Sequence, residues 1–363
     1  MLTKLIDTNH TEPPMEAVFA YRVKSARIQK GVTQAQLAEA LGISKQAVSQ
    51  YENGKKNPES KTLIAMAKYF QKPLEYFLRP VSASLDQVEF RKRASLKGKK
   101  LDAVKATILE KLEPYLELEH ILALDEPFEN PLINFQIREV EDAENAAKYL
   151  LQSWKLGLNP IPNILEMLED RGIKIIHVEL DPKFDGLSTF VGDRIPIIVL
   201  NEKMDTLRLR FTAMHELGHL LLPIDEESDH KFKEAVCNRF AGAMLMPGGV
   251  LMEELGSKRQ RISWAELIPI KEYYGISLAA LMYRCKDLGI LPLSILKRFW
   301  TLRNQHPNLK MEVGYGEYKG EERSARFEQL LSKALAEELI TYSKGASLAG
   351  IGLTELKETY QLI

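Results

Sequence analysis

The chain has 363 residues, enough for two or three domains. Hydrophobic residues make up 45% and charged residues 27%, as is typical of a soluble globular protein. No run of about 18 apolar residues predicts a membrane span, and the N-terminus lacks the pattern of a secretory signal. The two cysteines, Cys237 and Cys285, are too few for a disulfide framework. We therefore expect a cytoplasmic protein with no membrane partner.

Charge is distributed unevenly along the chain. The first 100 residues carry 18 Lys and Arg against 9 Asp and Glu, whereas the rest carries 31 against 41. A basic first quarter on an acidic body indicates a nucleic-acid-binding module at the N-terminus.

Residues 1–80 carry the signals of such a module. A helix is expected over 17–30, and Thr33-Gln34-Ala35-Gln36 reads as a capping box that opens a second helix. Gly42 ends that helix and Ser44 caps the next one, which continues to Glu52. Two short helices around Leu-Gly-Ile-Ser predict a helix-turn-helix. Residues 17–79 resemble the all-α lambda-repressor/Cro-like (XRE) DNA-binding domain.

The geometry of this motif places the start of the second helix against base edges in the major groove. Glutamine suits the edge of adenine and lysine that of guanine, while other polar residues meet phosphate. The candidate DNA contacts are Gln34, Ser44, Lys45, Gln46, Ser49, Asn53 and Lys55. The alternative is a small bundle with a solvated polar face. Because such domains read paired half-sites, the expected partner is a double-stranded operator and the expected state is a homodimer.

Residues 81–135 are expected to form a helical linker with a kink or break at Pro114. A dimerisation or spacer role suits such a segment. Residues 136–255 then alternate helical patterns with three β-like runs, at 173–179, 187–191 and 195–200. This order predicts a small α+β domain with its sheet beside the helix that follows.

That helix carries His215-Glu216-Leu-Gly-His219 inside an apolar run. Histidines four residues apart leave the same face of a helix, so both imidazoles can bind one zinc ion. Glu216 points to the side of them, where it can take a proton from a metal-bound water as a general base. The alternative is a buried helix with two accidental histidines.

A zinc site of this kind needs a third protein ligand, and Glu234 is our candidate. Asn238 lies four residues further on the same helical face, where it can hydrogen-bond a ligand histidine. The acidic run at residues 225–230 and the thiol of Cys237 are the other candidates. We regard the acidic run as a solvated loop, and the geometry of one helical turn disfavours Glu234 and Cys237 together.

His-Glu-Leu-Gly-His, followed by Glu-x-x-x-Asn-x-Phe-Ala and Leu-Met-Pro, resembles the ImmA/IrrE family of metallopeptidases over residues 142–247. The segments 184–188 and 198–201 are also similar to that family's pattern. The resemblance implies a gluzincin-like zincin domain with one zinc ion, or another divalent metal such as Mn²⁺, on two histidines and a glutamate. It also implies that a repressor-type protein is cleaved under stress. Cys237 stands where the family usually has alanine.

Residues 256–363 are expected to be a mainly helical C-terminal region. Trp264 to Cys285 mimics a second helix-turn-helix, but Leu278, Ala279 and Ala280 stand at the reader positions and cannot hydrogen-bond to bases. We therefore expect a packing or protein-binding module that covers the peptidase-like domain.

The sequence as a whole favours a multidomain, DNA-binding transcriptional regulator with zinc-dependent endopeptidase activity. The rival hypothesis is a non-cleaving, zinc-containing repressor that regulates its own gene in the manner of an antitoxin. An intact Glu216 favours the enzyme, because a site that only binds zinc has no need of it.

Overall fold

The computed structural model describes residues 15–79, 88–89, 98–124, 127–179, 184–192 and 194–360. It divides into two compact units: unit 1 comprises residues 1–126 and 326–363, and unit 2 comprises residues 127–325. The multidomain organisation expected from the sequence is thus present. The helical region expected over 256–363 is divided between the two units at residue 326.

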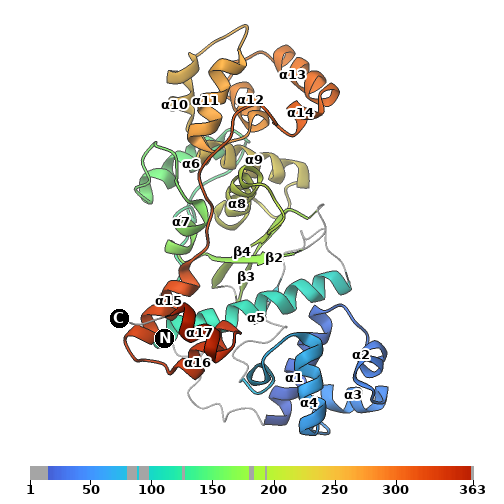
Figure 1. The fold of residues 1–363 in the computed structure, drawn as a ribbon. Helices are drawn as coiled ribbons and strands as arrows, with labels where there is room; N and C mark the ends of the chain where they lie inside the picture. Colours follow the sequence, from blue (N-terminus) through green and yellow to red (C-terminus); the bar gives the residue numbers. More distant parts are fainter. Residues whose placement is uncertain are drawn as a thin grey trace. The chain divides into compact units, whose positions relative to one another are not determined.

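Unit 1 begins with four α-helices and a short 3₁₀ helix around one apolar core (Figure 1). They are α1 (Met15–Gln29), α2 (Gln34–Leu41), α3 (Lys45–Glu52), α4 (Ser60–Phe70) and η1 (Leu74–Phe77). The core is filled mainly by aromatic and aliphatic side chains that include Phe19, Val23, Leu37, Val48 and Phe77. This bundle is the helix-turn-helix domain predicted from the sequence.

The predicted helix ends are confirmed. The Thr33 hydroxyl accepts a hydrogen bond from Gln36 N at 3.2 Å, and the Gln36 side chain accepts one from Thr33 N at 2.8 Å. Gly42 ends α2 in the left-handed conformation, and the Ser44 side chain caps α3. These local contacts set the turn between α2 and α3 without help from distant residues.

Helix α5 (Lys99–Ile121) packs against α1 and runs through Pro114 rather than ending there. Glu113 of α5 is buried against Arg22 of α1, with 2.6 Å between Oε2 and Nη1, and burial raises the pKa of this carboxyl. The C-terminal helices α15 (Arg326–Ala336), α16 (Tyr342–Ala349) and α17 (Leu353–Thr359) share a second core with α5. The segment expected as a linker is therefore partly an integral helix of unit 1, which also contains strand β1 (Val88–Glu89).

Unit 2 contains three strands in the order β3-β4-β2. Strand β2 (Lys174–Val178) runs parallel to β4 (Ile195–Asn201), and β3 (Gly186–Val191) runs antiparallel to β4, with Ser188 opposite Ile198. The three β-like runs of the sequence are confirmed. The helix that carries the two histidines packs against β3 and β4 (Figure 1).

That helix is α8 (Thr206–Leu221), and α9 (His230–Leu245) lies along it. Their shared core also takes in the short helices around them. These are α6 (Asp142–Ser153), α7 (Ile164–Asp170), α10 (Gly248–Leu255), α11 (Trp264–Tyr274), α12 (Leu278–Asp287), α13 (Leu293–Gln305) and α14 (Pro307–Lys310). Leu278 of α12 is fully buried in it, as the packing role predicted for this second helix-turn-helix requires.

A buried ion pair ties the end of unit 2 back to α8. The Arg210 side chain is fully buried and pairs with Glu322. Glu322 also accepts hydrogen bonds from the first backbone N–H groups of α7, from Ile164 at 2.7 Å and Leu165 at 3.1 Å. The segment before α15 is thereby held against the domain that carries α8.

Among the described residues, no single helix is long and apolar enough to cross a membrane. Helices α9 and α10 meet that test only when they are taken together across a 62° bend.

Candidate metal centre and nucleic-acid interface

Helices α8 and α9 bring the predicted metal ligands together. The Asp205 side chain caps α8 and the Asp229 side chain caps α9, each by accepting a backbone N–H from its first turn. Gly218 lies where the helices approach, and a Cβ at this position would stand 3.2 Å from the Phe240 ring and 3.4 Å from Cys237 Cα. The absence of a side chain at Gly218 therefore lets α9 come close enough for its side chains to reach the histidines of α8.

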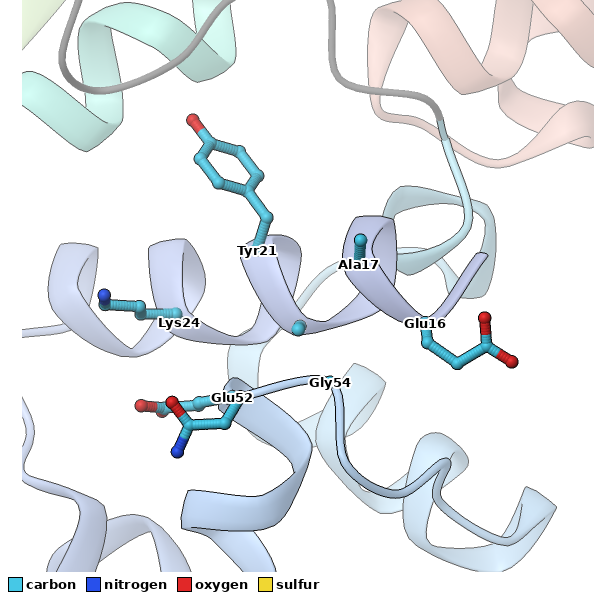
Figure 2. Close-up of a pocket in the computed structure, with 8 residues that line it drawn as sticks. Glu16, Ala17, Tyr21, Lys24, Glu52 and Gly54 are labelled. Carbon is cyan, nitrogen blue, oxygen red and sulfur yellow. The ribbon is translucent and has the colours of Figure 1, made fainter. Parts of the chain in front are cut away.

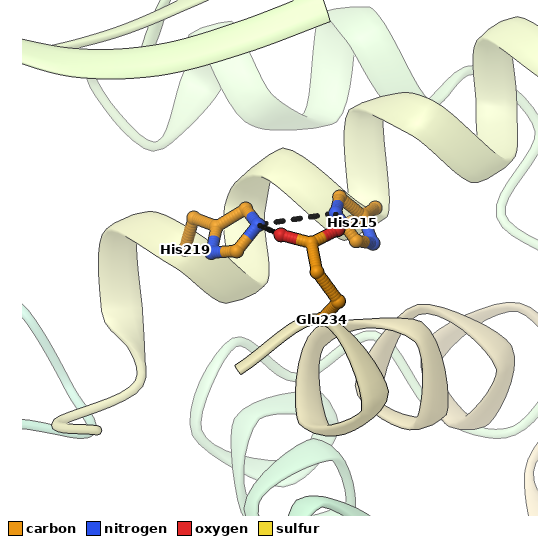
Figure 3. A group of neighbouring side chains, drawn as sticks. All are labelled: His215, His219 and Glu234. Atoms are coloured by element: carbon orange, nitrogen blue, oxygen red, sulfur yellow. Dashed lines mark hydrogen bonds and ion pairs between the residues drawn. The ribbon is translucent and has the colours of Figure 1, made fainter. Parts of the chain in front are cut away.

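Three donor atoms converge at this point (Figure 3). His215 Nε2 and His219 Nε2 are 3.1 Å apart, and in the Glu234 carboxylate Oε2 lies 3.3 Å from the first nitrogen and Oε1 lies 3.2 Å from the second. In tetrahedral coordination with bonds of about 2.0–2.1 Å, neighbouring donors stand about 3.3 Å apart. Two imidazoles and a carboxylate at these spacings fit zinc in number, chemistry and geometry.

The charges around these atoms also suit a cation. Burial lowers the pKa of His215, but the Glu234 hydrogen bond and the Glu216 and Glu234 carboxylates outweigh it, and the pKa is raised. The two histidines hold the pKa of Glu234 far below its usual range. The carboxylates thus stabilise positive charge where the donors meet, and a bound metal ion would take the place of the proton.

Two residues of α9 lie behind the donor atoms. Cys237 Sγ lies 3.2 Å from Nδ1 of His219. Asn238 is exposed, and its side-chain hydrogen bond is one of the causes that raise the pKa of His215, in line with the expectation that Asn238 hydrogen-bonds a ligand histidine. Because Cys237 faces Nδ1, it lies behind the ring and away from the Nε2 atoms that meet Glu234.

Glu216 lies beside the three donors on α8 and is 8% exposed. Its Oε2 accepts a hydrogen bond of 2.7 Å from the hydroxyl of Ser188, which lies on β3. Ser188 belongs to the segment 184–188 that the sequence pattern singled out, and the structure shows that its hydroxyl holds one oxygen of the Glu216 carboxylate. Neighbouring Asp185 pairs with Arg208 at 2.5 Å and so braces the turn before β3.

At the other candidate site, Lys45 and Gln46 are exposed in the first turn of α3. Ser44 is exposed too, but its Oγ already accepts the Ala47 N–H at 3.1 Å. Lys55 follows the helix and is exposed. The start of α3 therefore offers two unengaged polar side chains and one capping hydroxyl to a partner.

Two of the other residues predicted to contact DNA, Gln34 and Asn53, make hydrogen bonds within the domain that stabilise α3. Gln34 Nε2 donates to Glu52 Oε2 at 2.9 Å, and Arg27 donates to both oxygens of the same buried carboxylate. Asn53 donates to the backbone oxygen of Ser49 at 2.7 Å. Gln34 is thus placed to brace the end of α3 rather than to face outward.

A hollow lies between α1 and the turn after α3, with Glu16, Tyr21, Lys24, Glu52 and Gly54 in its wall (Figure 2). A Cβ on Gly54 would stand 3.5 Å from the backbone oxygen of Glu16, so the turn runs close to α1 here. The hollow marks the place where the end of α3 is held against the first helix.

Two family models match the chain. Residues 23–77 match the helix-turn-helix family, and residues 168–286 match the IrrE N-terminal-like domain, peptidase family M78. The chain thus combines a helix-turn-helix domain with an IrrE N-terminal-like domain. The second match extends past residue 255, so it includes α11 and nearly all of α12.

Two relatives from Bacillus subtilis (strain 168) are similar to part of the chain. The SPbeta prophage-derived uncharacterized HTH-type transcriptional regulator YonR is 33% identical over 69 residues, or 19% of this chain and 64% of the relative. The uncharacterized HTH-type transcriptional regulator YqaE is 37% identical over 62 residues, or 17% and 53%. The matched stretch therefore spans less than two thirds of either relative.

Proposed function

We propose that the chain is a DNA-binding transcriptional regulator whose second unit is a zinc-dependent endopeptidase. The observation that carries the proposal is the convergence of His215, His219 and Glu234 beside a carboxylate, Glu216, that lies outside this group of donors and accepts a hydrogen bond from Ser188. A site that only stores a metal has no need of such a carboxylate. The match to a peptidase family supports the same conclusion.

His215, His219 and Glu234 would hold the metal, and zinc suits this donor set, with Mn²⁺ as another possible ion. A zinc ion held there supplies Lewis acidity, which lowers the pKa of water and polarises carbonyl oxygens. Glu216 accepts the proton of the attacking water and then delivers it to the leaving amine. Its hydrogen bond to Ser188 orients the carboxylate for both transfers.

The helix-turn-helix domain would localise the enzyme on DNA, as a homodimer on paired half-sites. Lys45, Gln46 and Ser49 are the proposed base readers, while Asn53 and Lys55 would meet phosphate. Binding to an operator brings the peptidase to proteins bound nearby, and a repressor-type protein is therefore the proposed substrate. This role places the protein in the cytoplasm.

The proposal is tested by a survey of new protein N-termini in host cells that produce the wild type or Glu216→Gln, with and without DNA damage. We expect a cut that appears with the wild type alone, which would also name the substrate. If zinc is bound in both proteins and no cut differs under any stress, the peptidase is contradicted. The chain would then be a non-cleaving, zinc-containing repressor.

A further inference from the structure

A third histidine, His230, stands at the rim of the candidate metal centre. It is the first residue of α9, and its Nε2 lies 3.7 Å from Oε1 of Glu234, one helical turn further on. Asp229 accepts the Phe232 N–H at 2.7 Å and so fixes the start of this helix. His230 therefore belongs to the regular helix and leaves it on the same side as Glu234.

The two helices then offer matched pairs of donors. Helix α8 presents His215 and His219 four residues apart, and α9 presents His230 and Glu234 at the same spacing. Two such pairs facing each other supply four donors in all. Four protein donors make a closed zinc site, whereas a catalytic site keeps three and leaves one position open.

In the structure His230 stands just outside the centre. The group whose donor atoms all lie within 4.8 Å of one another consists of His215, His219 and Glu234. The His230 side chain is 75% exposed, so a rotation about its side-chain bonds breaks few contacts. The main cost of bringing its Nε2 to the metal is the loss of rotamer freedom.

We propose that His230 is an exchangeable fourth ligand of the metal. With its Nε2 bound, the centre is closed and water has no place on the metal; with the side chain swung out, the centre is open to substrate. The exchange is a ligand substitution in which the neutral imidazole donates a lone pair and a water molecule leaves. This proposal rests on the proposed function, since it requires a metal on the other three residues.

The closed form would keep the peptidase latent in the free protein. A substrate or partner that draws the His230 side chain away from the centre would activate it. The same residue would then control access to the site without taking part in proton transfer, which belongs to Glu216.

Zinc X-ray absorption of the zinc-loaded full-length protein tests the proposal, because it counts the imidazoles around the metal. We expect three in the wild type and two in His230→Ala and His230→Gln. Lys231→Ala, an exposed neighbour on α9, is the matched control and should keep three. Competition with a chelating dye should show zinc affinity about tenfold weaker in both His230 variants, with Lys231→Ala unchanged.

Acetohydroxamate supplies a readout that needs no substrate, because it binds zinc only where coordination positions are open. We expect it to bind the His230 variants more tightly than the wild type. Two imidazoles in the wild type, with equal zinc and hydroxamate affinity in wild type and variants, would overturn the fourth ligand and leave the proposed peptidase standing. A wild type that binds no stoichiometric zinc would overturn both.

Discussion

The molecule builds the same turn twice and uses it in two ways. In each unit a helix opened by a capping box ends at a left-handed glycine, and the turn reads Gly-Ile-Ser, at residues 42–44 and 275–277. In each case the serine caps the following helix, with Ser44 and Ser277 both accepting a backbone N–H at 3.1 Å. The local backbone chemistry of α2–α3 and α11–α12 is therefore nearly identical.

The surroundings of the two turns differ. A Cβ at Gly42 would meet nothing within 4 Å, whereas one at Gly275 would stand 2.6 Å from the Arg210 side chain. After the first turn Lys45 is exposed, and after the second Leu278 is fully buried. Capping signals thus specify the turn, and the side chains that follow it decide whether the start of the second helix is exposed or lies in the core.

The largest effect should come from removing the buried cation behind the second turn. Arg210 donates to the Gly275 carbonyl at 3.0 Å and pairs with Glu322, so Arg210→Ala leaves a buried carboxylate without its partner. We expect unit 2 to lose about 3–5 kcal/mol in its free energy of unfolding, measured in urea. Lys319→Ala, which removes an exposed ion pair, should change it by less than about 0.5 kcal/mol. Similar losses in Arg210→Ala and Lys319→Ala would contradict the stabilising role of the buried Arg210–Glu322 pair.

Truncating the side chain at the start of α12 should cost much more stability than truncating the one at the start of α3. Leu278→Ala creates a cavity in the core of unit 2, and we expect it to cost about 2–5 kcal/mol of stability. Lys45→Ala removes only solvated atoms and should cost less than about 0.5 kcal/mol. Thermal and urea unfolding of both variants measure the difference; equal costs would show that the turns are not used differently.

DNA affinity should show the reverse order. With an operator selected from a random library, Lys45→Ala or Gln46→Ala should each weaken binding by about 1–3 kcal/mol and relax specificity at one position. Lys55→Ala should weaken binding evenly across sequences and reduce the salt dependence by about one phosphate contact. Fluorescence anisotropy at several salt concentrations measures both effects. Lys310→Ala, exposed in unit 2, is the control, and an equal loss there would contradict the interface.

The helix caps of the first turn should contribute less. Thr33→Ala removes one half of the capping box and should cost unit 1 about 1 kcal/mol. Ser44→Gly keeps most of the capping energy but removes the hydroxyl, so its stability should fall by only a few tenths of a kcal/mol. If its DNA affinity also stays unchanged, Ser44 acts as a cap and is not a DNA contact.

The smallest expected effect is a difference between the two capping boxes in how their contribution to stability depends on pH. Hydrogen bonds from the Ser263 backbone, the Arg259 side chain and the Ser263 hydroxyl lower the pKa of Glu266 to about 2. Because this pKa lies below its ordinary value of 4.5, the stabilisation is complete above that pH and is lost as pH falls toward 2. The stability difference between wild type and Glu266→Gln should therefore shrink as the pH falls from about 5 to about 2. The Thr33→Ala difference should stay constant, since Gln36 does not titrate; a parallel decline would contradict the assignment.

Local signals account for what the sequence could predict. The caps of α2 and α3, the three strands, and the pairing of His215 with His219 all follow from spacings of a few residues. Glu234 was found because its helix follows closely and resembles a known pattern. Each of these features depends on residues that lie close together in the sequence.

The features that escaped prediction depend on how distant elements pack. The contact of Ser188 with Glu216 arises because β3 lies against α8, and that of Cys237 Sγ with Nδ1 of His219 arises because α9 packs along α8. Arg210 is a signal that could have been used, since an arginine on the buried face of an apolar helix requires a carboxylate. Only the fold shows that the carboxylate is Glu322.

In the proposed α8–α9 site the metal depends on His215, His219 and Glu234, whereas Glu216 is not a ligand. Native mass spectrometry of the zinc-treated full-length protein tests it directly. We predict one zinc ion per chain in the wild type and in Glu216→Gln, and none in His219→Ala or Glu234→Ala. Loss of zinc from Glu216→Gln, or retention by His219→Ala, would contradict the account.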